Sequence, residues 1–199
     1  MKKFLFPVAT AIVLACGVSL AAAAPAQIIL IRHGEKPAHG NQLDEQGFAR
    51  ARALVGYFKA NPAVTAYGTP VAIYAMKPKG PNGSVRPIQT VTPLAEALNL
   101  PVISDFLKDD ATGLVTAILG NKAYDGKMVL ICWEHNAIPD IVSALASAAG
   151  TADGVQDALP GSWDGDAFDR TWILDFSPDG KIVSFRDLPQ RLLPGDSAE

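Results

Sequence analysis

The chain has 199 residues, which is enough for one substantial hydrophobic core but short for two independent domains. Its formal net charge is −3, and its lysines and arginines are scattered along the sequence. No cluster of positive charge favours a nucleic acid or an anionic membrane surface as a partner.

The first 23 residues have the pattern of a secretory signal peptide. Two lysines follow the initial Met, and a long apolar stretch then leads into four alanines, the small residues that precede cleavage sites. Cleavage after Ala23 or after Ala26 satisfies this pattern. We therefore expect residues 1–23 to be removed and residues 24–199 to form a single domain that is periplasmic or secreted.

The two cysteines bear on this expectation. Cys16 lies within the apolar stretch, so a lipoprotein acylated at Cys16 is the alternative. A retained anchor is disfavoured because no stop-transfer charges follow, and we expect no stable membrane insertion after cleavage. Removal of Cys16 leaves Cys132 as the only thiol, so no disulfide can form within the chain. We expect Cys132 to be a small buried apolar side chain.

Five short runs predict strands, with helical patterns between most of them. The runs are Gln27–Ile31, Val71–Tyr74, Met128–Trp133, Thr171–Phe176 and Ile182–Phe185. Strands that alternate with helices are typical of α/β proteins. We expect a three-layer α/β/α sandwich with a mostly parallel sheet and antiparallel strands added near the end.

The first predicted helix begins at Asp44, a good N-cap, and stops before Asn61. Its apolar residues share one face and are Phe48, Ala51, Val55 and Phe58. A second helical segment, Pro87–Leu98, contains Pro93, which we expect to kink or restart it. A third helix, Ile138–Ala149, is amphipathic and is followed by Gly150, a common residue after a helix end.

The tetrapeptide Arg32-His33-Gly34-Glu35 directly follows the apolar run of the first predicted strand. It therefore leaves the sheet at the carboxyl end of a strand, where open α/β sheets bind ligands. Arginine offers a planar fork that matches phosphate oxygens, and a neutral imidazole is a nucleophile near neutral pH. The pair suggests phosphoryl chemistry without a metal.

His135 repeats this arrangement, because it lies between a predicted strand and the start of a predicted helix. Helix N-termini attract anions, so we expect the two histidines to face one pocket. A metal site made of His33, His39, His135 and a carboxylate is disfavoured, because none of the compact zinc-site spacings is present. We expect His39 to be an exposed loop residue.

Four elements in order carry a resemblance to a known family. They are Arg32–Glu35, then Leu43–Gly47 opening a helix, then Ser84–Arg86 followed by Thr90, then a strand ending in His135. Together they resemble the histidine phosphatase superfamily, in its phosphoglycerate-mutase-like group. The correspondence covers most of the chain after the signal segment.

The resemblance implies that His33 is the nucleophile that becomes phosphorylated. It also implies that Arg32, Arg86 and a protonated His135 bind the phosphoryl oxygens, with no metal and no cofactor. These roles agree with physical expectation, because positioned cations stabilise the charge of a phosphoryl group in transfer. Covalent capture divides the transfer into two easier steps, with water as the second acceptor.

Two carboxyl groups compete for the role of general acid. In the mutase-like branch a glutamate follows a leucine after the third strand region, and Asp109 stands at that position here. Glu134 directly precedes His135, although neighbouring side chains on a strand point to opposite faces. We keep both as candidates.

The segment from Ser162 to Arg170 carries aromatic and acidic residues before a predicted strand. We expect a capped loop whose aromatics cover the edge of the core. An alternative is that Trp163 or Asp166 lines the mouth of the substrate site.

The sequence therefore predicts an exported, metal-independent phosphatase that hydrolyses phosphomonoesters of small molecules through a phosphohistidine. One alternative is a phosphoglycerate-mutase-type phosphotransferase, which export disfavours because its substrate is supplied in the cytoplasm. The other is a catalytically weak module that binds phosphorylated ligands. The physiological substrate and the oligomeric state stay open.

Overall fold

A mixed sheet of six strands organises the computed structural model, which describes residues 24–198. The predicted signal segment, including Cys16, lies outside the described residues. The strand order is β3-β2-β4-β1-β5-β6. The strands are β1 (Gln27–Arg32), β2 (Ala72–Ala75), β3 (Val102–Ile103), β4 (Met128–Trp133), β5 (Arg170–Phe176) and β6 (Ile182–Pro189).

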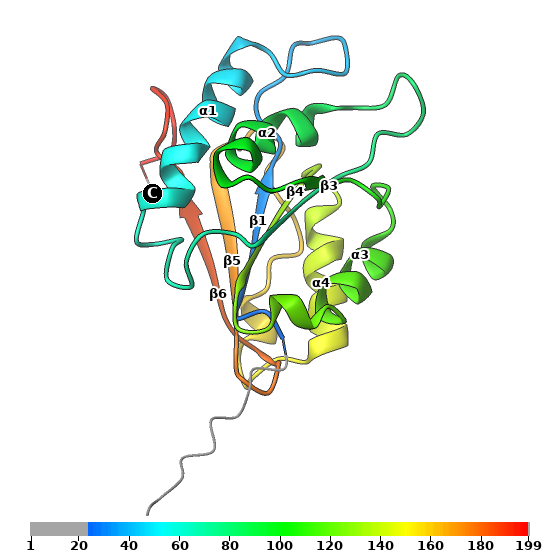
Figure 1. The fold of residues 1–199 in the computed structure, drawn as a ribbon, viewed down its shortest axis with the longest axis vertical. Coiled ribbons are helices and arrows are strands. Elements are labelled where there is room, and N and C mark those ends of the chain that lie inside the picture. Colours follow the sequence, from blue (N-terminus) through cyan, green and yellow to red (C-terminus); the bar gives the residue numbers. More distant parts are fainter. Residues whose placement is uncertain (1–23, 199) are drawn as a thin grey trace, which may run out of the picture.

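The first four strands are parallel, and β5 and β6 join the β1 edge in antiparallel pairing. Helices α1 (Glu45–Ala60) and α2 (Arg86–Leu98) cover one face of the sheet, and α3 (Ala111–Leu119) and α4 (Ile138–Ala149) cover the other (Figure 1). Short 3-10 helices span Lys122–Tyr124 and Gln156–Ala158. The predicted three-layer α/β/α sandwich with late antiparallel strands is confirmed.

The central strands are mostly apolar because both of their faces are covered, and Gln27 and Arg32 at the two ends of β1 are the exceptions. Ile28 and Leu30 of β1 pack on the side of α3 and α4, whereas Ile29 and Ile31 pack on the side of α1 and α2. Every residue of β1 and β4 is buried. Cys132 is one of them, and burial raises the pKa of its thiol, as expected for a small core side chain.

Helix α1 begins as predicted, with the Asp44 carboxylate accepting a hydrogen bond from the backbone N–H of Gly47 at 2.8 Å. Its buried face differs from the prediction, because Leu54 and Tyr57 are buried and Phe48 is 37% exposed. The reason is that the first turn of α1 packs on the Arg32–Glu35 segment, through Gly47 and Arg50, and not on the sheet.

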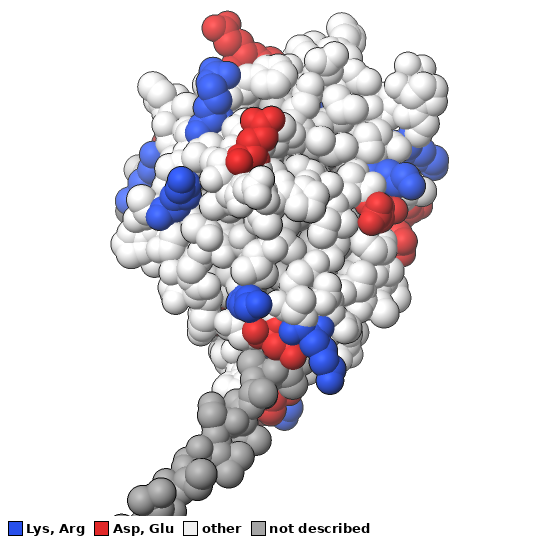
Figure 2. Space-filling model, viewed as in Figure 1, with Lys and Arg blue, Asp and Glu red and all other residues white. Residues whose placement is uncertain are grey.

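Helix α2 does not restart at Pro93, since it continues through that residue, and a kink there stays a prediction. Sequence reasoning also missed the two-residue strand β3 and helix α3, although Asp110 caps α3 by accepting from the N–H of Gly113 at 3.0 Å. Among residues 24–198, no helix has the length and apolar character needed to cross a membrane. On the face in Figure 2, positive and negative side chains are scattered among uncharged ones.

Two glycines let the Arg32–Glu35 segment lie directly on α1. A Cβ at Gly34 would stand 2.9 Å from the Cα of Gly47, and a Cβ at Gly47 would stand 2.3 Å from the carbonyl oxygen of Glu35. Both contacts involve backbone, which cannot move aside cheaply. The segment after β1 is therefore fixed against the helix by backbone-to-backbone contact.

This contact predicts opposite effects for two alanine substitutions in α1. Gly56→Ala adds a Cβ into open space and favours the helix, so it should stabilise the protein by about 0.5–1 kcal/mol. Gly47→Ala should instead destabilise the protein by about 1–3 kcal/mol, because the new Cβ overlaps the backbone of Glu35. Urea denaturation of both variants measures the difference. Equal effects of the two substitutions would contradict the contact.

Candidate active site

His33 lies just beyond β1 and is only 2% exposed. Its backbone N–H donates to the carbonyl of Trp133, the last residue of β4, at 3.0 Å. Its ring Nδ1 lies 2.7 Å from the carbonyl oxygen of Gly34, so Nδ1 carries the proton and donates it. The Nε2 lone pair is thus available for nucleophilic attack.

The surroundings of His33 keep its imidazole neutral. The pKa of His33 is lowered to about 4, mainly by burial and also by the charges of Arg32 and Arg86. The carbonyl of Gly34 and the carboxylate of Glu134 act in the opposite direction without reversing the shift. Near neutral pH the ring is in its neutral form, in which a ring nitrogen can act as a nucleophile.

Arg32 is buried beside His33, and its guanidinium is held by neutral groups. Its Nη1 donates to the carbonyl oxygens of Gly165 and Ala167 at 2.6 and 3.1 Å. Its Cζ lies 3.6 Å from the centre of the Phe168 ring. Its Nε is buried and has no hydrogen-bond partner within residues 24–198. Burial lowers the pKa of Arg32 to about 10, a value at which the group is still charged near neutral pH.

A second buried arginine, Arg50, is fully paired with carboxylates and so contrasts with Arg32. Arg50 is as buried as Arg32, but its guanidinium contacts the carboxylates of Glu35 and Asp196 at 2.6 Å each. Burial acts to lower the pKa of Arg50, but these hydrogen bonds outweigh it and raise the pKa above the ordinary value. Arg50 is neutralised inside the fold, whereas Arg32 lacks a hydrogen-bonded carboxylate. A buried cation of that kind favours an incoming anion.

Arg86 stands at the start of α2, where the sequence placed it, and is connected to the same segment. Its Nε donates to the carbonyl of Gln42 at 3.0 Å, and its Nη2 donates to the carbonyl of Gly40. The hydroxyl of Thr90 accepts from the N–H of Gly34 at 2.9 Å and donates to the carbonyl of Arg86 at 2.8 Å. Thr90 thus fixes the first turn of α2 to the backbone next to His33.

His135 follows the end of β4 and lies close enough to Arg32 for the two side chains to interact electrostatically. Its Nδ1 is 2.8 Å from one oxygen of Glu134, and the ammonium of Lys108 is 2.7 Å from the other oxygen. Burial lowers the pKa of His135, and the charge of Arg32 lowers it further. The charge of Glu134 acts in the opposite direction without reversing this shift. A bound anion would favour the protonated form.

The two candidate acids occupy different places. Burial acts to raise the pKa of Glu134, but Lys108 and His135 outweigh it and the pKa is lowered, so the free protein holds a carboxylate there. The charge of Glu134 acts on Arg32, His33 and His135. Asp109 is exposed and lines a hollow between α3 and α4 with Asp140.

The fold therefore brings together Arg32, His33, Arg86, Glu134 and His135. No group of three or more metal-ligating side chains within residues 24–198 is arranged to hold a metal ion. Sequence reasoning missed the contact between Arg32 and Phe168. Its only signal was the aromatic and acidic character of that loop, whose Gly165 lies 133 residues from Arg32 along the chain.

The chain matches no protein-family model and no curated protein. Its fold is similar to that of the protein histidine phosphatase SixA in complex with tungstate, with a TM-score of 0.51 and 17% identity over 82% of this chain and 97% of that one. It is also similar to a phosphoglycerate mutase from Plasmodium falciparum, with a TM-score of 0.51 and 16% identity over 87% and 96%. Identities this low show the fold alone, and they confirm the phosphoglycerate-mutase-like fold that the sequence resemblance implied.

The neutral, buried His33 predicts that the protein loses stability in acid. The unfolded chain, with a histidine pKa of 6.5, binds a proton more readily than the folded chain, so stability falls from about pH 6.5 towards pH 4. His33→Gln removes this effect, which is worth about 3 kcal/mol by pH 4. Urea denaturation at pH 7 and pH 4 should show the variant gaining that much relative to the parent protein.

His39→Gln is the matched control, because His39 is an exposed loop histidine. It should follow the parent protein at both pH values. A parent protein and a His33→Gln variant with the same pH dependence would contradict the burial of a neutral His33.

Proposed function

We propose that the protein is a phosphatase that hydrolyses phosphomonoesters through a phosphohistidine on His33. The observation that carries the proposal is the pairing of two buried groups. The Nε2 of a neutral imidazole is available at His33, and beside it Arg32 presents a guanidinium without a hydrogen-bonded carboxylate. A nucleophile and an unneutralised cation in one buried place suit the transfer of a phosphoryl group.

The first step is attack of His33 Nε2 on phosphorus, while the bond from phosphorus to the ester oxygen breaks. The Nε edge of Arg32 and the imidazole of His135 bind the phosphoryl oxygens, whose charge they stabilise. Arg86 contributes mainly its charge, because its Nε and Nη2 already donate to carbonyls. In the second step water attacks the phosphohistidine, which releases inorganic phosphate and restores neutral His33.

The solved structures of similar fold support this proposal. One of them is the protein histidine phosphatase SixA in complex with tungstate, an oxyanion with the tetrahedral shape of phosphate. The other is a phosphoglycerate mutase, which keeps phosphotransfer as the alternative to hydrolysis. Export from the cytoplasm favours hydrolysis, since water is the acceptor that is always available outside it.

We propose that the protein is exported and that cleavage follows Ala23. Ala24 and Ala26 belong to the fold, because the carbonyl of Ala24 accepts from the N–H of Gly126 at 2.8 Å and the N–H of Ala26 donates to Lys127 at 2.9 Å. Cleavage after Ala26 would remove both bonds. The mass of the exported protein should correspond to a chain that begins at Ala24, and a chain that begins at Gln27 or at a lipidated Cys16 would contradict it.

The test of catalysis is hydrolysis of 4-nitrophenyl phosphate by the exported protein in excess chelator. We expect turnover to persist in chelator and to fall by about a thousandfold or more in His33→Ala, because the nucleophile is lost. His39→Ala is the matched control and should keep full activity. Loss of turnover on chelation would contradict the metal-free mechanism. Tight binding of phosphate without any turnover would identify a binding module.

We propose that Glu134, and not Asp109, protonates the leaving oxygen. Glu134 acts electrostatically on His33, and a bound phosphoryl dianion nearby would raise its lowered pKa. Glu134→Gln should slow alkyl phosphates by about 10²–10⁴-fold and nitrophenyl phosphate much less, because an alkoxide needs a proton to leave and a nitrophenolate does not. Rates across a series of leaving groups measure this. Asp109→Asn is the matched control, and a selective loss with alkyl phosphates in that variant would reverse the assignment.

A further inference from the structure

We propose that Phe168 is a positioning residue of this site, which holds the Arg32 guanidinium so that its Nε edge faces the phosphoryl group. This inference rests on the proposed function. It concerns the segment Ser162–Asp169, which we call the strap. The strap lies against Arg32 through the carbonyls of Gly165 and Ala167 and through the Phe168 ring.

The contacts of the strap fix both the plane and the rotation of the guanidinium. The Phe168 ring lies 3.6 Å from Arg32 Cζ, which defines the face that the group presents. Nη1 donates hydrogen bonds to the two carbonyls, and these bonds set the rotation of the guanidinium within that plane. Neither Nε nor Nη2 of Arg32 makes a hydrogen bond within residues 24–198, and Nε but not Nη2 is fully buried, so the edge that these two atoms form is the one left for a ligand. A long side chain with many rotamers is thereby held in one geometry.

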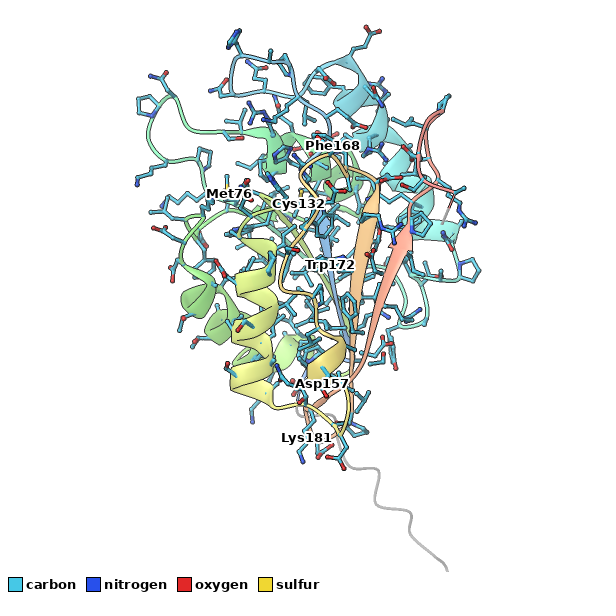
Figure 3. All side chains as sticks on the ribbon, turned by 180° about the vertical axis from the view of Figure 1, so that it is seen from behind. Met76, Cys132, Asp157, Phe168, Trp172 and Lys181 are labelled. Atoms are coloured by element: carbon cyan, nitrogen blue, oxygen red, sulfur yellow. The ribbon has the colours of Figure 1, made fainter. Side chains whose placement is uncertain are left out.

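The strap is itself held by the core. The indole N–H of Trp163 donates to the same Ala167 carbonyl at 2.9 Å. The Trp163 ring packs on Trp172 of β5, with ring centres 4.6 Å apart, and both are buried. Figure 3 shows Trp172 in the middle of the sheet and Phe168 near its end. Packing therefore connects the sheet to the strap, and the strap to Arg32.

The chemistry of the strap suits a cation that must stay available. Carbonyl oxygens and an aromatic face contact the Arg32 guanidinium directly, unlike the two carboxylates that bind Arg50. The charges of Asp164 and Asp166 in the strap also act on Arg32, but neither carboxylate hydrogen-bonds it. A carboxylate in the place of Phe168 would compete with phosphate for Arg32. The same ring also stands 6.1 Å from the His33 ring, centre to centre, so it covers both the cation and the nucleophile.

The test measures binding of tungstate and of inorganic phosphate by calorimetry. Phe168→Leu keeps a similar apolar volume but removes the aromatic face, and we expect about tenfold weaker binding. Phe168→Tyr keeps the face and should restore binding. Phe176→Leu is the matched control, because Phe176 is buried at the opposite end of β5 from the strap, where its N–H donates to the carbonyl of Ala26 at 2.9 Å. It should leave binding unchanged.

A double-mutant cycle with Arg32→Lys separates positioning from general loosening. If Phe168 acts through the guanidinium, Phe168→Leu should cost no further affinity in the Arg32→Lys background. Additive losses, or equal losses in Phe168→Leu and Phe176→Leu, would overturn the proposal.

A readout without a ligand distinguishes failure of the positioning role from failure of the proposed function. In the free protein, the NMR signal of the Arg32 Nε–H should be shifted upfield by the Phe168 ring, and Phe168→Leu should remove the shift. If tungstate and phosphate do not bind the parent protein, the proposed function fails. An Arg32 signal that is the same with and without the Phe168 ring would overturn the positioning role.

Discussion

The charge of Arg32 is buried at the end of β1 without a hydrogen-bonded carboxylate, and the rest of the site depends on that constraint. An unneutralised guanidinium is costly in a protein interior, so its surroundings must stabilise it by other means. The carbonyls of Gly165 and Ala167 and the ring of Phe168 do this. The same charge lowers the pKa of His33, although burial has the larger effect. One cation thus attracts an anion and helps to keep the nucleophile neutral.

The scaffold around this charge is rigid because it is made of backbone contacts and a fully paired ionic network. Gly34 meets Gly47 with no room for a side chain, which fixes the turn after β1 against α1. Arg50 then connects Glu35 to Asp196 in the C-terminal segment. The two buried arginines differ in their partners, since Arg50 is paired with two carboxylates and Arg32 contacts two carbonyls and an aromatic ring.

The sequence predicted the elements whose signals are local. The apolar run of β1, the N-cap at Asp44 and the glycine after α4 each depend on a few neighbouring residues, and all three are present in the structure. Pro93 does not make α2 restart, because tertiary packing holds the helix together in spite of its local cost. Phe48 misled the prediction of the α1 face, because the first turn packs on another loop.

The sequence by itself determined the fold class, the longer strands and helices, and the motif that carries Arg32 and His33, since periodicity and short spacings record what each segment buries. The tertiary structure decided which charges are neutralised. Nothing in the sequence distinguishes the two arginines. Only the fold shows that Arg50 contacts two carboxylates, whereas Arg32 contacts carbonyls and an aromatic ring. Gly165 lies 133 residues from Arg32 along the chain and Asp196 lies 146 residues from Arg50, and the electrostatics of burial depend on distance in space.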